Sequence, residues 1–503
     1  MDVIIVLPIH LFESNDLINN DSHVYIYEHP SYFTNYDYHK LKLILHRSTM
    51  KFYYDYINNK HNCQTKYLEY TYDVENIFKK YQNKKINIYD PVDHDIMEQF
   101  NQFAIKYNID LVVHDTLSFI EPYDDLTHYY NLNAANISQT SFYIWQRKRY
   151  NILVDKNQKP INGKWTFDKE NREPYSKEFN ENITDINFKQ TNNKYVQEAV
   201  KYVNKYFKNN PGSDNFYLPN DFTGAKKHLT KFIKERLDCF GPYQDTVSEN
   251  IVFGCHSVLS PLLNTGLLTP TYVIERILDY YEKNKKNLNF SSVEGIVRQI
   301  IGWRSWMRYN YMFKHKELIN DNYFNHTRKL DKSWYTGKTG IVPIDDIIMK
   351  VLKYGYAHHI ERLMYIGNFM LLSQIHPKEV YKWFQSLFID SYTVFMETNV
   401  YGMSQYSCGP LLVSRPYFSS SNYIDKMSSY TRKPDVYPRI ILNKEEYEWY
   451  EIWDALYYNF IKNNKLKFKK NYSTARSVGH WDRKSPGQKR ELLKIATNFL
   501  YWI

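Results

Sequence analysis

The chain opens with Val3-Ile-Ile-Val-Leu-Pro-Ile9, an uninterrupted apolar run rich in β-branched residues. Such a run predicts a strand buried on both faces, as in a parallel sheet. Further apolar runs follow at strand-like length, with one helical stretch between them. The expected strands are 3–7, 24–27, 86–89 and 111–114, and the expected helix is 41–57. Strand, helix and strand at this spacing predict an α/β domain that ends near residue 135.

The chain has 503 residues, 43% of them hydrophobic and 24% charged, which excludes disorder as its main state. Lys and Arg exceed Asp and Glu by 65 − 55, a formal charge of +10. Tyr, Asn, Lys and Ile are abundant, and all four have AT-rich codons. Codon bias therefore explains part of the positive charge, and the charge alone is weak support for a polyanionic partner.

Four cysteines, Cys63, Cys239, Cys255 and Cys408, are too few and too scattered for a disulfide framework or a CxxC metal site. We therefore expect a reducing compartment. The first apolar run follows Asp2 and is too short for a signal peptide, and no stretch approaches 18 apolar residues. These features predict a soluble, intracellular protein without a membrane segment.

Residues 140–225 are polar, rich in Asn and Lys, and interrupted by prolines, which predicts a long connector with one helix around 196–207. From residue 226 onward, apolar residues recur at the spacing of an α-helix. Apolar residues at spacings of three and four predict a helix over 293–307, and further helical regions cover 344–372 and 379–395. The last 275 residues or so are thus expected to form an all-helical domain.

The segment Phe253–Leu268 brings small hydroxyl groups to the start of a helix that begins with Pro261. Hydroxyls and free backbone N–H groups at a helix N-terminus suit a phosphate or pyrophosphate. The alternative interpretation is an ordinary helix cap, with Ser260 capping and Pro261 in the first turn.

Downstream, Arg304 and Arg308 share a helix face beside Trp303 and Trp306. Arginines bind phosphates and indoles offer stacking surfaces, so this helix can face a cofactor or a nucleic acid. A solvated basic face over a tryptophan-filled core is the competing interpretation.

In Tyr356–Met364, His359 lies in line with an apolar stripe formed by Leu363, Ile366 and Met370. An imidazole there suits proton donation, although a hydrogen-bonded core histidine is the more common case. His358 and His359 are adjacent, whereas a two-histidine metal site on a helix needs a spacing of four. We therefore expect no metal site.

Three polar segments have less specific patterns. Asn399–Tyr406 is expected to be a turn rich in donors, and Arg415–Tyr423 a polar aromatic loop. In the connector, Lys164, Asp168 and Arg172 surround two aromatic residues. That group can contact a nucleic acid or simply dock the connector.

Several motifs, taken in order, resemble the photolyase-related proteins, the bacterial iron–sulfur (6-4) photolyases and cryptochromes of the cryptochrome/photolyase superfamily. They are LPIHLF (7–12), YEHPSYF (27–33), HKLKLILHRSTMKFY (39–53), GKWTFDKENR (163–172), GPYQD (241–245), CHSVLSPLLNTGLL (255–268), RQIIGWRSWMR (298–308), YAHHIERLMYIGNFMLL (356–372), NVYGMSQY (399–406), RPYFSSSNYIDKMS (415–428) and RSVGHWDRKSP (476–486). Each is moderately specific, and their common order spans the whole chain.

The resemblance implies a Rossmann-like α/β antenna domain (1–138), a long linker (139–225) and a large all-α FAD-binding domain (226–503). It implies a monomeric FAD enzyme that repairs (6-4) photoproducts in UV-damaged DNA under blue light, with histidine proton donation. Two alternatives are a cryptochrome-like photoreceptor without repair activity, and a flavoprotein or DNA-binding protein that has lost its photochemistry.

The resemblance also assigns roles to individual residues. Those matched to FAD are His256, Ser257, Leu259, Ser260, Asn264, Gln299, Trp303, Arg304, Asp390 and Asn399. Those matched to the lesion pocket are His358, His359, Tyr417, Asp168 and Arg172, with His359 as the expected proton donor. Glu28 falls where family members bind a lumazine antenna, 6,7-dimethyl-8-ribityllumazine.

The chain departs from the family at its iron–sulfur cluster and its electron route. The positions of the four cluster cysteines fall at Pro343, Thr431, Pro434 and Tyr447. Because such a cluster needs thiolate ligands, we expect none, and we expect packing alone to hold the helical domain. Trp383 keeps the aromatic residue expected beside the flavin, while Phe384 replaces a family Tyr and Tyr335 a family Trp.

Overall fold

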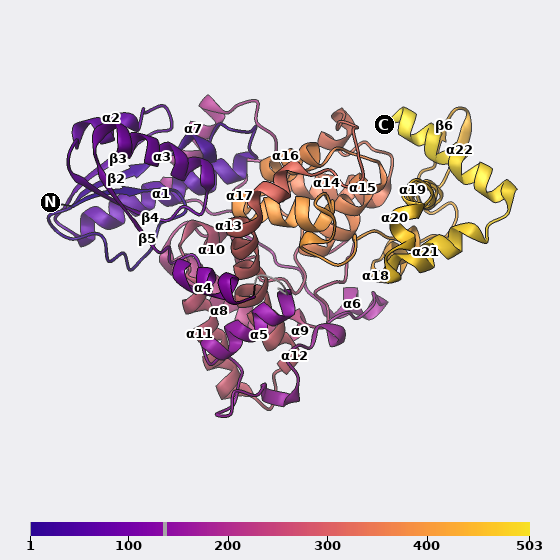
Figure 1. The fold of residues 1–503 in the computed structure, drawn as a ribbon, viewed down its shortest axis with the longest axis horizontal. Coiled ribbons are helices and arrows are strands. Elements are labelled where there is room, and N and C mark those ends of the chain that lie inside the picture. The colour runs from indigo at the N-terminus through magenta and orange to yellow at the C-terminus, as the bar shows by residue number, and fades with distance from the viewer. Residues whose placement is uncertain (1, 134–137) are drawn as a thin grey trace.

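The computed structural model describes residues 2–133 and 138–503. An α/β domain forms one end of the molecule, and helices from the middle and the end of the chain form the rest (Figure 1). The chain therefore has the expected fold class, a Rossmann-like α/β domain followed by a large helical domain. None of the described helices combines the length and apolarity that a membrane crossing requires.

The α/β domain contains a parallel sheet with the strand order β3-β2-β1-β4-β5. Its strands are β1 (Val3–Val6), β2 (His23–Tyr27), β3 (Gln64–Leu68), β4 (Lys85–Tyr89) and β5 (Asp110–His114). Its helices are α1 (Lys40–Lys60), α2 (Glu75–Lys80) and α3 (His94–Tyr107), whereas the next helix, α4 (Tyr123–Asn133), packs with Phe142 and Trp306 of helices that follow. The four strands expected from the sequence are present, and β3 was missed because it is polar and only partly buried.

The strand order reverses between β1 and β4, because the chain adds strands first on one side of β1 and then on the other. In open α/β sheets, ligands bind at the carboxyl ends of the strands where this reversal occurs. The segments that leave β1 and β4 at this edge contact the helical domain, through Leu11 N–H to the Thr265 oxygen and through Asp90 to Arg308.

The connector carries α5 (Gln139–Arg149), α6 (Lys177–Asn182) and α7 (Lys194–Tyr206). α7 is the helix expected around 196–207. It packs on α1 and buries Val196, Ala199 and Val203, which recur at helical spacing.

The first half of the helical domain contains α8 (Phe222–Glu235), α9 (Leu237–Phe240), α10 (Ser260–Thr265), α11 (Pro270–Asn284), α12 (Phe290–Val297), the π-helical segment η4 (Arg298–Arg304) and α13 (Ser305–Asn320). Because α12, η4 and α13 follow one another without a gap, the amphipathic helix expected over 293–307 is present. Apolar side chains of α12 and η4 belong to the same buried core as those of the sheet.

The second half contains η5 (Lys332–Tyr335), α14 (Val342–Tyr354), η6 (Glu361–Gly367), α15 (Asn368–Leu372), α16 (Pro377–Leu387), α17 (Thr393–Met396), η7 (Glu397–Ser404) and α18 (Ser421–Met427). After the hairpin β6 (Ile440–Leu442) and β7 (Glu445–Tyr447) come α19 (Trp449–Asn463), α20 (Lys465–Lys469), α21 (Tyr472–Asp482) and α22 (Pro486–Trp502).

Three expectations for this half were wrong in detail. The hairpin β6–β7 interrupts the helices. Asn399 to Ser404 lie in the π-helical η7 rather than in a turn. The helix expected over 379–395 ends at Leu387, because Phe388–Tyr392 leave the helical path before α17.

A disulfide joins Cys239 at the end of α9 to Cys255 in the loop before α10. The sequence-based expectation that packing alone holds the helical domain was therefore wrong. The two residues lie 16 positions apart, and their spacing matches no recurrent motif.

Candidate functional site

Asp390 is the centre of a hydrogen-bonded cluster that joins three distant segments. Ser260 Oγ donates to its Oδ2 at 2.5 Å, and Asn264 Nδ2 donates to its backbone oxygen at 2.9 Å. Arg362 binds both carboxylate oxygens, at 2.9 and 3.1 Å. The helix-cap interpretation of Ser260 was wrong, because its hydroxyl contacts Asp390 and caps no backbone N–H group.

The loop before α10 is strained. Val258 adopts φ = 52°, in the left-handed region that β-branched residues rarely enter. Strain of this kind persists only where the surroundings impose it, and it is frequent at ligand-binding loops. Ser257 on one side accepts a hydrogen bond at its backbone oxygen from His228, and Leu259 on the other side is buried.

The other end of α10 docks on the α/β domain. Its last carbonyl, on Thr265, accepts a hydrogen bond from the Leu11 N–H at 3.1 Å. Gly266 follows with φ = 89°, and a Cβ at this position would approach the Phe12 ring to 2.9 Å. Glycine is therefore required here, both by conformation and by space.

Arg304 forms no ion pair with a carboxylate among the described residues. Its Nη1 donates to Asn264 Oδ1 at 2.6 Å and its Nε to the Ser118 oxygen at 3.1 Å. The rings of Phe119 and Phe395 lie 4.9 and 4.6 Å from the guanidinium carbon. Burial lowers the pKa of Arg304 to about 9, although the charge of Glu121 raises it. An anionic ligand would offset the free-energy cost of removing this charge from water.

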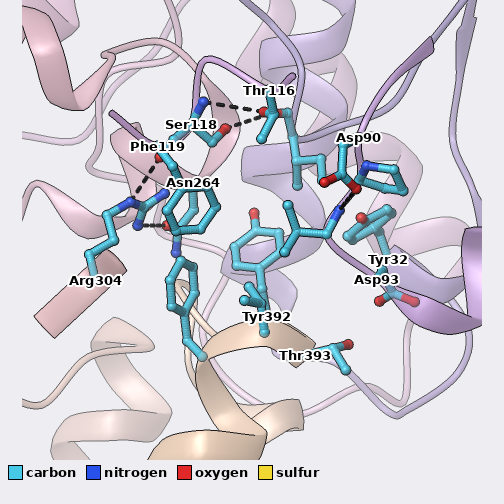
Figure 2. Close-up of a pocket in the computed structure, with 15 residues that line it drawn as sticks. Tyr32, Asp90, Asp93, Thr116, Ser118, Phe119, Asn264, Arg304, Tyr392 and Thr393 are labelled. Atoms are coloured by element: carbon cyan, nitrogen blue, oxygen red, sulfur yellow. Dashed lines mark hydrogen bonds between the residues drawn. The ribbon is translucent and has the colours of Figure 1, made fainter. Parts of the chain in front are cut away.

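Figure 2 shows the cavity beside Arg304. It has a volume of about 30 Å³ and lies between the segment after β4, with Asp90 and Asp93, and Tyr392 and Thr393 of the helical domain. Asn264 and Arg304 line it too. The cavity thus lies at the reversal of the strand order, where α/β sheets bind ligands.

Arg308 has neither of the roles considered for it from the sequence. It is fully buried, and its Nη1 donates to the Glu121 oxygen at 2.6 Å, so it fastens the helical domain to the α/β domain. Trp306 is also buried and stacks on Tyr309. Gln299, Trp303 and Asn399 are only partly buried, the first two on η4 and the third on η7.

His256, from the loop before α10, meets the adjacent pair His358 and His359. The rings of His256 and His358 stack with centroids 4.4 Å apart, and the ring of His359 lies 5.7 Å from that of His256. Burial, reinforced by nearby positive charges, lowers the pKa of both His256 and His358 well below the usual value. These two imidazoles are neutral at physiological pH.

The expected burial of His359 on an apolar stripe was wrong. His358 is the buried member of the pair, and the side chain of His359 is 48% exposed. The reason is local, because residues 356–358 are not helical and the helix begins only at His359. His359 Nε2 lies 3.1 Å from Asp245 Oδ1.

The linker brings two charged residues to the same region. Asp168 forms ion pairs with Arg172 and, at 3.0 Å, with Arg298. The charges of both Asp168 and Arg172 influence the pKa of Tyr417, which burial raises. Lys164, by contrast, pairs with Glu170 on the exposed side of the linker.

The linker is held in this place by backbone contacts with residues 242–246. Glu173 N–H donates to the Pro242 oxygen at 3.1 Å, and Thr246 Oγ1 donates to the Glu173 oxygen at 2.9 Å. Asp245, on the same segment, is the acid beside His359. The linker that carries Asp168 and Arg172 is thus anchored to the segment that carries Asp245.

Aromatic side chains connect the Asp390 cluster with the interior. Phe388 lies 4.1 Å below the Arg362 guanidinium and contacts Trp383 edge-on. Trp383 is fully buried, and its Nε1 donates to the Trp334 oxygen at 2.9 Å. Tyr335, the neighbour of Trp334, is only partly buried, whereas Trp334 is fully buried.

Glu28 is buried in the α/β domain, and both of its carboxylate oxygens have protein partners. Arg47 Nη1 lies 2.9 Å from Oε1, the Tyr67 hydroxyl donates to Oε1 at 2.5 Å, and Tyr70 N–H donates to Oε2 at 3.2 Å. Tyr67 also lines an open cavity of about 650 Å³ between α1, β3 and α7.

The four positions matched to cluster cysteines lie at the start of α14 (Pro343), in the loop after α18 (Thr431 and Pro434) and in β7 (Tyr447). The helical domain has three cysteines in all, Cys239, Cys255 and Cys408. The first two form the disulfide, and Cys408 is buried.

Sequence reasoning missed Asp245, Glu361 and Arg362 as parts of the site. All three fall inside motifs that the resemblance quoted, GPYQD and YAHHIERLMY. Their roles depend on contacts between distant segments, so the motif itself was the only available signal.

Comparisons with known proteins agree with this architecture. The family described as "Deoxyribodipyrimidine photo-lyase-related protein" matches residues 4–217. A "(6-4) photolyase" of Agrobacterium fabrum is 30% identical over 417 residues, which cover 83% of this chain and 80% of that protein.

Two solved structures share the fold. The class III photolyase of Agrobacterium tumefaciens has a TM-score of 0.52 at 13% identity, with 85% of this chain and 86% of that chain covered. The cryptochrome of Synechocystis has a TM-score of 0.53 at 12% identity, with 97% and 93% covered.

Proposed function

Because the chain belongs to the cryptochrome/photolyase superfamily, we propose that it is a blue-light-dependent, FAD-containing photolyase that repairs pyrimidine (6-4) photoproducts in DNA. The observation that carries this proposal is that the linker with Asp168 and Arg172 is anchored to residues 242–246, where Asp245 contacts His359. These residues come from the linker and from two parts of the helical domain.

The residues around Asp390 fit a flavin dinucleotide. Arg304 is a partly buried cation that forms no ion pair among the described residues, which suits the diphosphate. The strained loop at Val258 suits a ligand-binding segment. The cavity beside Arg304 holds about 30 Å³, so a dinucleotide requires its walls to separate.

The residues that would hold FAD are Ser257, Leu259, Ser260, Asn264, Gln299, Trp303, Arg304, Asp390 and Asn399, with His256 at the border to the lesion pocket. Reduced FAD supplies the light-driven electron when bound. Arg362 orients the Asp390 carboxylate, and Ser260 and Asn264 fix it from the side of α10.

His359 is the proposed proton donor. Its exposure gives a flipped-out lesion access to the ring, and Asp245 orients it through Nε2 at 3.1 Å. His358 is buried and neutral, so it shapes the pocket wall rather than donating a proton. Arg172, 55% exposed, is available to the DNA backbone or the lesion.

We further propose that the protein works without an iron–sulfur cluster. Four thiolates are needed, and the helical domain has three cysteines, two of them in a disulfide. The electron route then starts at Trp383 and continues through Tyr335 or the fully buried Trp334. For the antenna, the large cavity lined by Tyr67, whose hydroxyl contacts Glu28, supports a lumazine.

The test is repair of an oligonucleotide with a single (6-4) photoproduct by FAD-loaded, reduced protein under blue light. We expect light-dependent restoration of the two pyrimidines, separated by chromatography, by a monomer bound to the damaged DNA. His359→Ala should retain FAD and lose repair. His480→Ala, an exposed histidine on α21, is the matched control and should repair normally.

Other results would point elsewhere. Repair of cyclobutane dimers alone would contradict the lesion class. Light-driven structural change without repair of either lesion would favour a cryptochrome-like photoreceptor, and a colourless protein that cannot be loaded with FAD would contradict both. An absorption spectrum with a broad iron–sulfur shoulder, or iron in the purified protein, would contradict the absence of the cluster.

A further inference from the structure

The three histidines beside the lesion pocket can converge on a single point. One ring nitrogen from each of His256, His358 and His359 lies within 4.8 Å of the other two. Four ligands around a zinc ion at 2.0–2.1 Å place their donor atoms about 3.4 Å apart. Zinc binding therefore requires the rings to turn toward one another, and the nearly parallel rings of His256 and His358 must leave their stacked arrangement.

Two of these imidazoles have buried nitrogens without a hydrogen-bond partner. They are Nε2 of His256 and Nδ1 of His358, in side chains that are 8% and 5% exposed. A buried polar atom without a partner costs free energy and needs a physical reason. An imidazole nitrogen with a free lone pair is a ligand that zinc uses.

Carboxylates lie behind two of the rings. Glu361, fully buried, places Oε2 at 3.8 Å from His358 Nε2, the nitrogen opposite the unpartnered one. The same oxygen accepts a hydrogen bond from His358 N–H at 2.9 Å, which fixes the carboxylate beside the ring. Asp245 holds His359 Nε2. Histidine ligands of metals usually have such carboxylates at their second nitrogen.

We propose that His256, His358 and His359 bind a zinc ion, with the fourth coordination position open toward the lesion pocket. Three imidazoles favour zinc and similar late transition metals, whereas Mg²⁺ and Ca²⁺ prefer oxygen ligands. Asp245 and Glu361 are positioning residues for the rings rather than ligands.

Zinc at this site regulates the protein. This part rests on the proposed function, because His359 is there the proton donor. A histidine whose lone pair binds a metal cannot also deliver a proton from that nitrogen, and an ion at the pocket wall obstructs the lesion. Zinc is therefore a reversible inhibitor of repair, removed by a chelator.

Binding is measured first, in the dark, on FAD-loaded protein without a polyhistidine tag. We expect one Zn²⁺ per chain by calorimetry, and Co²⁺ should show tetrahedral bands at wavelengths beyond the flavin absorption. His359→Gln, at an exposed position, and His256→Gln should weaken binding by more than about 100-fold, whereas Asp245→Asn should weaken it by roughly 10–100-fold. His480→Ala should bind like wild type.

Repair is measured second, with and without Zn²⁺. We expect zinc to suppress repair and EDTA to restore it. Failure of Zn²⁺ to bind, or undiminished binding by both glutamine variants, overturns the site. Zinc that binds without suppressing repair overturns the regulation. Failure of metal-free wild type to repair counts against the proposed function alone, because the binding measurement uses neither light nor DNA.

Discussion

Arg362 and Asp390 form a two-pronged ion pair at 2.9 and 3.1 Å, inside the cluster that also contains Ser260 and Asn264. The Asp390 side chain is 7% exposed and the Arg362 side chain 16%. Removal of one partner from a buried pair leaves an uncompensated charge, which costs about 3–5 kcal/mol.

Asp390→Asn should therefore lower the free energy of unfolding by about 3 kcal/mol and abolish the stabilisation that added FAD gives wild type. Denaturant unfolding with and without FAD measures both effects. Asp435→Asn is the matched control, because Asp435 pairs with Arg439 on the surface and is 77% exposed. Its effect should stay below about 1 kcal/mol. Equal effects of the two variants would refute the central role of Asp390.

The disulfide between Cys239 and Cys255 should contribute measurably to stability. It closes a loop with a sequence separation of 16 residues, and a loop of this size corresponds to about 3 kcal/mol. We expect Cys239→Ser to lower the free energy of unfolding by about that amount under oxidising conditions, and to match wild type once both are reduced.

Cys63→Ser is the control for this variant, since Cys63 lies unpaired in the α/β domain. Its effect should stay within about 0.5 kcal/mol. If dithiothreitol leaves the stability of wild type unchanged, the disulfide does not form in solution.

Acid should destabilise the protein through His39, which joins α1 to the end of α14. Its Nδ1 accepts a hydrogen bond from Leu41 N–H, and its Nε2 contacts the Leu352 oxygen at 3.0 Å. The ring must be neutral to accept at Nδ1. Burial lowers the pKa of His39 to about 4.

Between about pH 6.5 and 4, the histidine of the unfolded state, with a pKa of about 6.5, binds a proton that the folded state does not bind. Stability from His39 is thus complete above about pH 6.5 and is lost as the pH falls toward about 4, by roughly 1.4 kcal/mol per pH unit. The Asn side chain in His39→Asn still accepts a hydrogen bond at the N-cap but does not titrate. Unfolding of the variant should therefore take up one proton fewer in this pH range, which lowers the slope of the free energy of unfolding against pH. Denaturant unfolding at several pH values in this range measures the slopes, and equal slopes would exclude His39 as a contributor.

The class of fold could be predicted from the sequence because its apolar runs are long and their period is clear. β3 was missed because Gln64–Leu68 form a polar, partly buried strand at the edge of the sheet. The π-helical path of Asn399–Ser404 and the break after Leu387 arise from packing among α13, α16 and η7, which local propensity does not report.

For the site, residue types could be predicted but not their environments. The adjacency of His358 and His359 was plain from the sequence. The assumption that both lie in a helix led to the wrong one being expected in the interior, because the helix begins only at His359. The approach of His256 to this pair depends on a contact between residues about 100 positions apart. The pairing of Cys239 with Cys255 depends likewise on how α9 meets the loop before α10.

Arg172→Ala should separate lesion binding from folding and from flavin binding. Asp168 keeps its ion pair with Arg298 at 3.0 Å when Arg172 is removed, so the linker should stay in place, with a change in stability of at most about 1 kcal/mol. The absorption spectrum of the FAD-loaded protein should not change. Loss of a hydrogen bond to a charged group of the DNA should weaken lesion binding by about 1.5–3 kcal/mol.

Binding of lesion-containing duplex is measured by anisotropy over a range of salt concentrations. If Arg172 binds the DNA backbone, it neutralises about one phosphate. The variant should then reduce the magnitude of the slope of log K against the logarithm of the salt concentration by about one. Arg476→Ala, an exposed arginine on α21, should change neither quantity. A lower affinity with an unchanged salt dependence would place Arg172 against the lesion bases. Wild-type affinity in the Arg172 variant would remove it from the DNA interface.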